Sequence, residues 1–194
     1  MLLIASFLFA VVTVPLCGGR LTRLADAPFR RGRLLVVALA LQIAVISIVP
    51  GGPPWLWSAI HLATYGMLAL VVAANRGLPG VPVLAFGGAL NLVAVLANGG
   101  VMPATPEALR AAGISTDAVG FVNSGIVADP RLAVLGDIFA IPAGWPLANV
   151  FSIGDVLIGL GGWCAIHALC GSRVAGWTRR SVALDPPSRC ATPG

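Results

Sequence analysis

The sequence is poor in charge and contains no lysine. Only 10% of its 194 residues are charged, and all twelve basic residues are arginine. By contrast, 58% of the residues are hydrophobic, and the mean hydropathy is +0.94. A single small domain leaves much of its surface exposed, so its core alone could not hide this amount of apolar side chain. Composition therefore predicts that lipid covers the remainder.

The sequence also lacks the short motifs of common enzyme and cofactor classes. It has no phosphate-binding loop, dinucleotide fingerprint, paired-histidine zinc helix or nucleophile elbow. Its two histidines lie far apart in the chain, and its four cysteines match no metal-binding spacing. We therefore predict no cofactor and no metal site. Although the net charge is +5, the arginines are grouped along the chain in a way that indicates topology, so we expect no nucleic acid partner.

Long apolar runs are abundant, and they set the predicted fold class. A helix needs roughly 20 residues to cross a lipid bilayer, with about 17 tolerated. The pattern therefore predicts an all-α, polytopic membrane helical bundle with about five transmembrane helices. The apolar runs that would form them cover residues 2–17, 34–49, 56–74, 81–97 and 150–170.

The positions of the arginines predict an orientation for this bundle. Ten of them follow the first and third runs or lie in the tail, whereas Arg110 and Arg131 lie between the fourth and fifth runs. Because positive residues favour the cytoplasmic side, we expect a multi-pass protein of a bacterial inner membrane. Its N-terminus would be outside and its C-terminus cytoplasmic. Residues 1–170 would form one transmembrane domain, followed by a disordered cytoplasmic tail at 171–194.

The polar residues inside the apolar runs are the candidate site. A buried polar group without a partner costs roughly 2 kcal/mol or more, so these residues should have partners or a function. Gly87, Asn91, Ala94 and Asn98 are spaced to form one helix face that contacts protein. In the predicted topology, the polar groups converge at the outer end of the bundle and form a pocket. The candidate ligand-binding residues are His61, Asn91, Asn98, Asn123, Asp137, Ser152 and Asp155.

The segment 99–149 is much longer than an ordinary helix connection, and such segments are often functional. Thr105-Pro106-Glu107 predicts the start of a short helix that Gly113 ends. Asp129-Pro130 predicts a second one that Gly136 ends, and residues 121–125 between them read as a turn. An apolar strip follows at residues 136–142. We expect the segment to be a lid of short helices over the outer pocket.

Each candidate residue also has a structural interpretation. Ser152 and Asp155 have the spacing of a capping box at a helix start. Asn91 is typical of contacts between helices, and Asn98, followed by two glycines, is a helix stop. His61 can be an interior histidine with a hydrogen-bond partner, and Asp137 a turn residue. These structural roles are compatible with a further role in binding.

Several of these residues together resemble a known family. The pattern consists of Asn98-Gly99-Gly100-Val101-Met102-Pro103, Asn123, Leu135-Gly136-Asp137 with Pro142, and Val150-Phe151-Ser152-Ile153-Gly154-Asp155. It is similar to the bacterial integral-membrane family DUF5317, a domain of unknown function. The resemblance implies a membrane fold and draws attention to Asn98, Asp137 and Asp155. It implies no activity.

Three functions remain open at this stage. The favoured one is a non-enzymatic binding or accessory subunit whose outer polar pocket engages a lipid, a quinone or a partner membrane protein. The first alternative is a membrane-embedded enzyme acting on an external or lipid substrate, with Asp155 or Asp137 as acid/base. The second is a proton- or ion-linked carrier. The chain shows no internal repeat, which argues against this alternative. We expect a binding protein rather than an enzyme.

Overall fold

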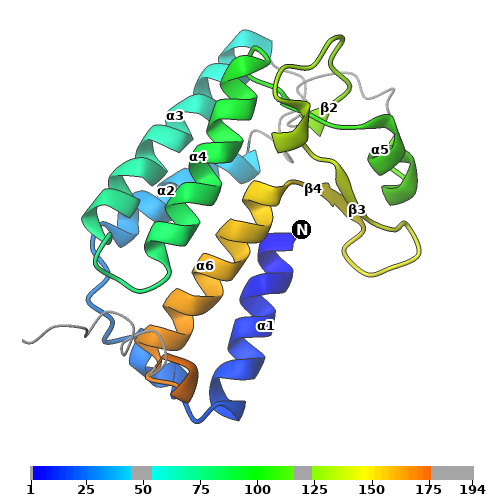
Figure 1. Cartoon of the computed structure of the whole chain (residues 1–194). Coiled ribbons are helices and arrows are strands. Elements are labelled where there is room, and N and C mark those ends of the chain that lie inside the picture. The colour runs from blue at the N-terminus through cyan, green and yellow to red at the C-terminus, as the bar shows by residue number, and fades with distance from the viewer. Residues whose placement is uncertain (1, 45–53, 116–123, 176–194) are drawn as a thin grey trace, which may run out of the picture.

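The computed structural model describes residues 2–44, 54–115 and 124–175. The described chain is mainly helical, and five longer helices correspond to the five apolar runs (Figure 1). Shorter helical turns lie between them. The helices are α1 (Leu2–Leu16), η1 (Leu21–Leu24), α2 (Gly32–Ile43), α3 (Pro54–Ala74), α4 (Val81–Ala97), α5 (Pro106–Ala112), η3 (Ala133–Leu135) and α6 (Ile153–Leu169).

The five longer helices pack in an order that differs from their order along the chain. The most extensive contacts join α4 to α6, α1 to α6, and α2 to α3, and a smaller contact joins α3 to α4. The spatial order is therefore α1, α6, α4, α3, α2, with the first and last helical runs of the chain side by side (Figure 1). This order places α6 between α1 and α4, so its residues contact both neighbours.

Glycines allow α6 to approach α4 closely. A Cβ atom added at Gly87 of α4 would lie 2.5 Å from the carbonyl oxygen of Gly154, and one at Gly161 would lie 2.6 Å from that of Gly80. The predicted protein-facing stripe of α4 is confirmed for Gly87, Asn91 and Ala94, which are buried. Only small residues permit such an approach of two backbones.

The segment between α4 and α6 contains strands as well as helices. Two parallel strands, β1 (Met102–Pro103) and β2 (Ser124–Gly125), pair with each other. Two antiparallel strands, β3 (Phe139–Ile141) and β4 (Asn149–Phe151), form a second small sheet. We call residues 99–149 the insert. With α5, these strands make it a folded unit beside the end of α4 (Figure 1).

The predictions for the insert were partly correct. The first short helix is confirmed as α5, where the Thr105 hydroxyl accepts a hydrogen bond from the Ala108 amide at 3.2 Å and Gly113 adopts φ 67°. The second is wrong in extent, because only η3 forms, and Asp129 adopts a left-handed conformation. The predicted turn is wrong at its described end, which is strand β2.

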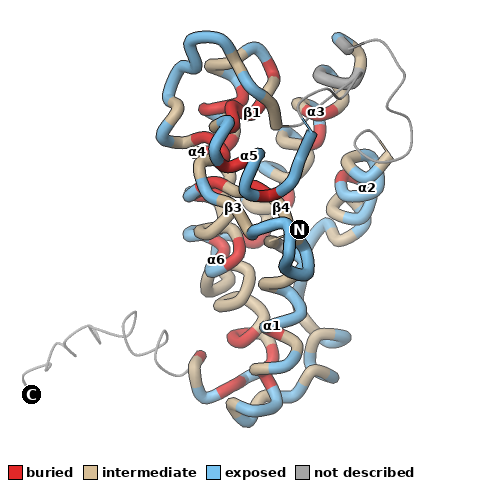
Figure 2. The backbone as a smooth tube through the Cα atoms, turned by 90° about the vertical axis from the view of Figure 1, so that its right-hand side faces the viewer, coloured by how far each residue is buried: buried red, intermediate tan, exposed pale blue. Residues whose placement is uncertain are grey.

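In the described residues, two buried clusters of small and medium-sized apolar side chains lie where the insert meets strand β4 and where it meets α4. One joins α5 to strand β4 through Leu109 and Val150, and the other joins α4 to strand β1 through Val95 and Met102. Much of the remaining helix surface is exposed, as the pale blue parts of α1 and α2 indicate (Figure 2). Phe9 and Phe86 are each 60% exposed.

The prediction of a five-span membrane bundle is wrong for the described residues. Helices α1, α2, α4 and α6 have 15, 12, 17 and 17 residues, and α3 carries His61, Thr64 and Tyr65. None of the described helices combines the length and the apolar character that crossing a bilayer requires. The fold is also not all-α, since the insert contains strands.

The predicted location depended on these crossings and is corrected with them. Multi-pass insertion in a bacterial inner membrane, with an external N-terminus and a cytoplasmic C-terminus, has no support from the described helices. The integral-membrane description is likewise not shown by the described helices. The predicted disorder of the tail concerns residues 176–194, which lie outside the described part of the chain.

Candidate functional site

The start of α6 carries the most closely connected group of predicted site residues. The Ser152 hydroxyl accepts a hydrogen bond from the Asp155 amide at 3.0 Å, and Asp155 Oδ2 accepts one from the Ser152 amide at 3.1 Å. This reciprocal pair is the capping box that the sequence predicted, and it is confirmed. It satisfies two backbone N–H groups that the first turn of a helix leaves without helical partners.

Asn91 of α4 extends this capping box into a closed ring. Its Nδ2 donates to Asp155 Oδ1 at 2.8 Å, and its Oδ1 accepts from the Ser152 hydroxyl at 2.8 Å. Ser152 has no exposed surface, and Asn91 is 6% exposed. Because the Ser152 hydroxyl both donates and accepts, all three side chains depend on one another. The ring therefore joins α4 to α6 through three interlinked side chains.

Asp137 occupies a different place, on the approach to β3. Its amide donates to the Pro103 carbonyl at 2.8 Å, and its carbonyl accepts from the Thr105 amide at 3.2 Å. Its side-chain Oδ2 accepts a hydrogen bond of 2.5 Å from the Ser124 hydroxyl. Asp137 thus connects β1, β2 and β3, and with 4% exposure it is a buried carboxyl group rather than a solvated turn residue.

Asp155 lies close enough to Asp137 to affect the charge of the Asp137 carboxyl group. Burial raises the pKa of Asp137 to about 6, the hydrogen bond from Ser124 opposes this increase, and the negative charge of Asp155 adds to it. Tyr65 of α3 belongs to the same neighbourhood, since burial and the charges of both acids raise its pKa to about 12. Three titratable side chains from α3, the insert and α6 therefore gather here.

His61 is connected to this group through Tyr65. The two rings meet edge to face with their centroids 5.3 Å apart. His61 Nδ1 is 2.9 Å from Gln42 Oε1, which can only accept, so Nδ1 carries the proton. Gln42 Nε2 in turn donates to the Thr64 hydroxyl at 2.6 Å, and burial lowers the pKa of His61. The neutral histidine joins α2 to α3.

The hydrogen bonds of the Asn98 side chain are with the main chain, and through them it holds the insert. Its Nδ2 donates to the Arg131 carbonyl at 2.8 Å, and its Oδ1 accepts from the Arg131 amide at 2.9 Å. Asn75, which the sequence analysis did not single out, binds the main chain of Arg30 in the same way at the end of α3. Each asparagine also donates to the carbonyl four residues earlier. Both residues are asparagines at the end of an apolar helix, and this shared position is the sequence signal that could have indicated Asn75.

A second polar group, also missed from the sequence, joins α1 to α6. The Thr13 hydroxyl donates to the Phe9 carbonyl and accepts from Trp163 Nε1 at 3.0 Å. His167 Nε2 lies 2.9 Å from the same hydroxyl, and its Nδ1 lies 2.8 Å from the Ser172 hydroxyl. Since the Thr13 proton is already used, Nε2 of the neutral histidine donates and Nδ1 accepts. Trp163 and His167 are four residues apart on α6, and this spacing could have indicated that they share one helix face.

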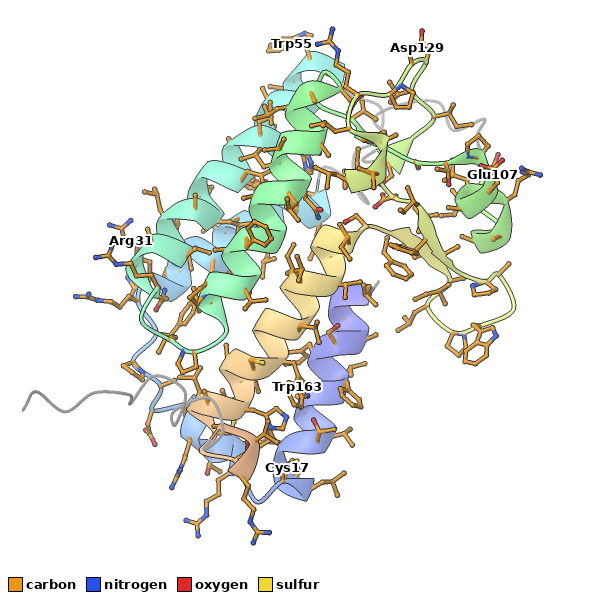
Figure 3. The ribbon with its side chains drawn as sticks, viewed as in Figure 1. Cys17, Arg31, Trp55, Glu107, Asp129 and Trp163 are labelled. Atoms are coloured by element: carbon orange, nitrogen blue, oxygen red, sulfur yellow. The ribbon has the colours of Figure 1, made fainter. Side chains whose placement is uncertain are left out.

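Above this polar group, α1 and α6 enclose an open apolar groove of about 270 Å³. Trp163, visible between the two helices in Figure 3, lies in its lining. Sequence reasoning did not find the groove, because it forms between the two ends of the chain. Its lining residues are Leu2, Ser6, Phe9, Val156, Gly159, Leu160 and Trp163.

The predicted site is therefore divided rather than forming one pocket. Asn91, Ser152 and Asp155 form a hydrogen-bonded ring, with Asp137 within electrostatic reach of Asp155. His61 contacts Tyr65 and Gln42, Asn98 binds the main chain of the insert, and Asn123 lies outside the described residues. Within the described ranges, no three His, Cys, Asp or Glu side chains gather in a way that could hold a metal ion.

Replacing Asp137 with asparagine should change how stability depends on pH. The folded protein binds this proton more tightly than the unfolded chain, so stability should fall as the pH rises from about 4 to about 6. A shift from 3.8 to about 6 corresponds to about 3 kcal/mol. Asp137→Asn should remove this loss and be more stable than wild type at pH 7.

Urea unfolding at pH 4, 5, 6 and 7 would measure this effect. Asp129→Asn removes an exposed acid from the same insert and controls for the change in net charge. If Asp137→Asn lowered stability at pH 7, the buried carboxylate would be a favourable charged partner, contrary to this account.

Comparison with known proteins identifies the family. Residues 26–167 match the model of a family of unknown function, DUF5317. Since the match covers more than half of the chain, the protein belongs to this family, as the sequence pattern indicated. The matched segment contains α2, α3, α4, the insert and α6 as far as His167, but not α1.

One curated relative is similar over part of its length. An uncharacterized protein of Thermotoga maritima is 29% identical over 108 residues, which are 56% of this chain and 62% of the relative. The chain thus matches less than two thirds of that protein. No solved structure matches the chain. These comparisons assign the family and no activity.

Proposed function

We propose that this protein is a non-enzymatic binding protein whose ligand is a lipid, held by its hydrocarbon chain between α1 and α6. The apolar groove of about 270 Å³ is the observation that supports this proposal. It is slightly smaller than the roughly 300–1,000 Å³ typical of sites for compact small molecules. Its position along two parallel helices suits an elongated chain more than a ring system.

The surface beyond the groove supports the same ligand class. On α1, Leu2, Ser6, Phe9 and Leu16 share one helical face, and Leu16 is 78% exposed. From Leu2 to Leu16 this mainly apolar stripe, which Thr13 interrupts, is about 20 Å long at about 1.5 Å per residue. It leads toward the arginine residues that follow α1, so an elongated ligand with one polar end fits its course.

The use of the polar side chains favours binding over catalysis. In the ring of Asn91, Ser152 and Asp155, both carboxylate oxygens and both carboxamide heteroatoms accept or donate hydrogen bonds within the protein. The Asn98 carboxamide is similarly engaged with the Arg131 main chain. Groups held in this way position helices and are poorly placed to react with a substrate.

Quenching of Trp163 fluorescence by a lipid with brominated chains tests the proposal. In a variant that retains only Trp163, with Trp55, Trp57, Trp145 and Trp177 changed to phenylalanine, brominated phospholipid in detergent micelles should quench saturably. Unlabelled phospholipid should reverse the quenching. A second variant that retains only Trp145, which is 70% exposed in the insert, controls for contact with the micelle.

Equal and non-saturable quenching of both variants would contradict a lipid site between α1 and α6. If a quinone reversed the quenching and unlabelled phospholipid did not, the ligand of the groove would be a quinone rather than a lipid. Circular dichroism of each variant would verify that the helices are retained.

One observation favours a second candidate function, acid/base catalysis by Asp137. A carboxyl group with a pKa of about 6 can donate or accept a proton near neutral pH. Complementation of a strain lacking the gene separates the two candidates. An enzyme should lose function with Asp137→Asn even though that variant is more stable, whereas a lipid-binding protein should retain both function and Trp163 quenching.

A further inference from the structure

The exposed arginines are concentrated at one end of the molecule. Seven of the nine in the described ranges lie near the ends of α1, α3 and α6 and the start of α2, and Asp26 is the one acidic residue among them. In Figure 3, Arg31 lies at the left and Cys17 at the bottom, both away from Glu107 at the right and Asp129 at the top right. The seven are Arg20, Arg23, Arg30, Arg31, Arg33, Arg76 and Arg173.

These arginines have no acidic partners in the described part of the chain. The one ion pair found there joins Arg110 to Glu107, on α5 in the insert. A cluster of exposed like charges without counter-charges is unfavourable for the folded protein by itself and attracts anions. A bound anionic group would explain why the arginine cluster is present.

The main chain around Arg20 and Arg173 is fixed, so these side chains are presented from a rigid base. The Arg20 amide donates to the Cys170 carbonyl at 3.0 Å, and the Arg173 amide donates to the Cys17 carbonyl at 3.0 Å. These two hydrogen bonds tie the ends of α1 and α6 together. Arg23 is close by, with its guanidinium against Gly171.

The apolar groove and this basic end belong to the same pair of helices. The stripe of α1 that lines the groove continues past Thr13, whose hydroxyl contacts Trp163 and His167, to Leu16 and the arginines after the helix, and α6 continues from Trp163 to Arg173. A ligand whose chain lay in the groove and ran along this stripe would bring its polar end to the two arginines. Guanidinium groups bind phosphate through paired, charge-assisted hydrogen bonds, which favours a phosphate at that end.

We propose that Arg20 and Arg173 bind the phosphate group of an anionic phospholipid whose chain occupies the α1–α6 groove. This inference rests on the proposed function and names its ligand more closely. It requires selectivity for anionic over zwitterionic lipid of equal chain length. A zwitterionic head group places a positive charge beside its own phosphate, which opposes binding at a basic surface.

The experiment compares brominated phosphatidylglycerol with brominated phosphatidylcholine on the protein that retains only Trp163. Phosphatidylglycerol should bind about tenfold more tightly at low salt, and the preference should decrease as salt screens the charges. Arg20→Gln with Arg173→Gln should remove the preference. Arg131→Gln, which removes an exposed arginine from the insert, should leave it intact.

Each outcome has a distinct meaning. If both lipids quench Trp163 equally, the groove binds lipid but the arginines do not recognise its head group. If neither lipid quenches, the proposed function itself fails. If inorganic phosphate at millimolar concentration displaces phosphatidylglycerol while Trp163 quenching by phosphatidylcholine persists, the arginines bind free phosphate rather than a lipid head group.

Discussion

Replacing Gly161 with alanine should strongly destabilise the contact between α4 and α6. The added methyl group would collide with the amide nitrogen of Leu84, lie 2.6 Å from the Gly80 carbonyl oxygen and lie 2.8 Å from Leu84 Cβ. Two of these neighbours are backbone atoms that cannot rotate away, so the helices must separate. We expect a loss of about 3 kcal/mol, at the upper end of the usual cost of overpacking.

The neighbouring residue provides a matched control. Gly162 lies on the same helix, and a Cβ atom added there would meet no heavy atom within 4 Å. Gly162→Ala should therefore be neutral or stabilise the protein by up to about 1 kcal/mol, because alanine favours helix more than glycine does. The free energy of unfolding of both variants would be measured by urea titration followed by circular dichroism.

Equal stabilities of the Gly161→Ala and Gly162→Ala variants would contradict this description of the contact between α4 and α6. A second test lies within the other helix, where a Cβ atom at Gly87 would lie 2.5 Å from the Gly154 carbonyl oxygen, while Gly88 faces open space. Gly87→Ala should behave like Gly161→Ala, and Gly88→Ala like Gly162→Ala. Loss of stability in both Gly87 and Gly161 variants would place the close contact on both helices.

Local sequence signals predicted those features that depend on neighbouring residues. Thr105, Pro106 and Gly113 mark both ends of α5, because capping and left-handed conformations are determined by residue type. Ser152 and Asp155 likewise predicted the start of α6. The periodic spacing of Gly87, Asn91 and Ala94 correctly indicated the buried face of α4.

Features that require distant parts of the chain could not be predicted in the same way. The groove lies between Leu2–Leu16 and Ile153–Leu169, which are opposite ends of the sequence. Gly159 and Gly162 look alike in the sequence, yet a Cβ atom at Gly159 would lie 2.6 Å from the Ser6 hydroxyl, whereas Gly162 is open. Which glycine faces a neighbour depends on the packing order of the helices.

The error about the membrane came from composition. A high apolar content shows that much apolar surface needs cover, but it does not fix how long each helix is. The structure gives α4 and α6 17 residues each and places strands within the insert. In contrast, the grouping of the arginines was visible in the sequence, and seven of the nine described arginines lie near the ends of α1, α3 and α6 and the start of α2. The grouping remained valid although its topological interpretation failed.

Asn91→Leu is expected to be the second strongly destabilising change, for a reason opposite to overpacking. Leucine has nearly the shape of asparagine, so no large cavity forms, but it removes the acceptor of the Ser152 hydroxyl and the donor to Asp155 Oδ1. Ser152 is fully buried, and an unsatisfied buried group costs about 1–3 kcal/mol, more when charged. We expect a loss of about 3 kcal/mol.

A double-mutant cycle separates the ring from simple changes in helix packing. Ser152→Ala should cost about 1 kcal/mol through loss of the helix cap, and in its presence Asn91→Leu should cost less than in wild type. Val93→Leu, at a position of α4 that is 48% exposed, controls for leucine in this helix. Additive effects of Asn91→Leu and Ser152→Ala would mean that the two side chains act independently. The ring, and with it the link by which α4 positions Asp155 near Asp137, would then not contribute to the fold.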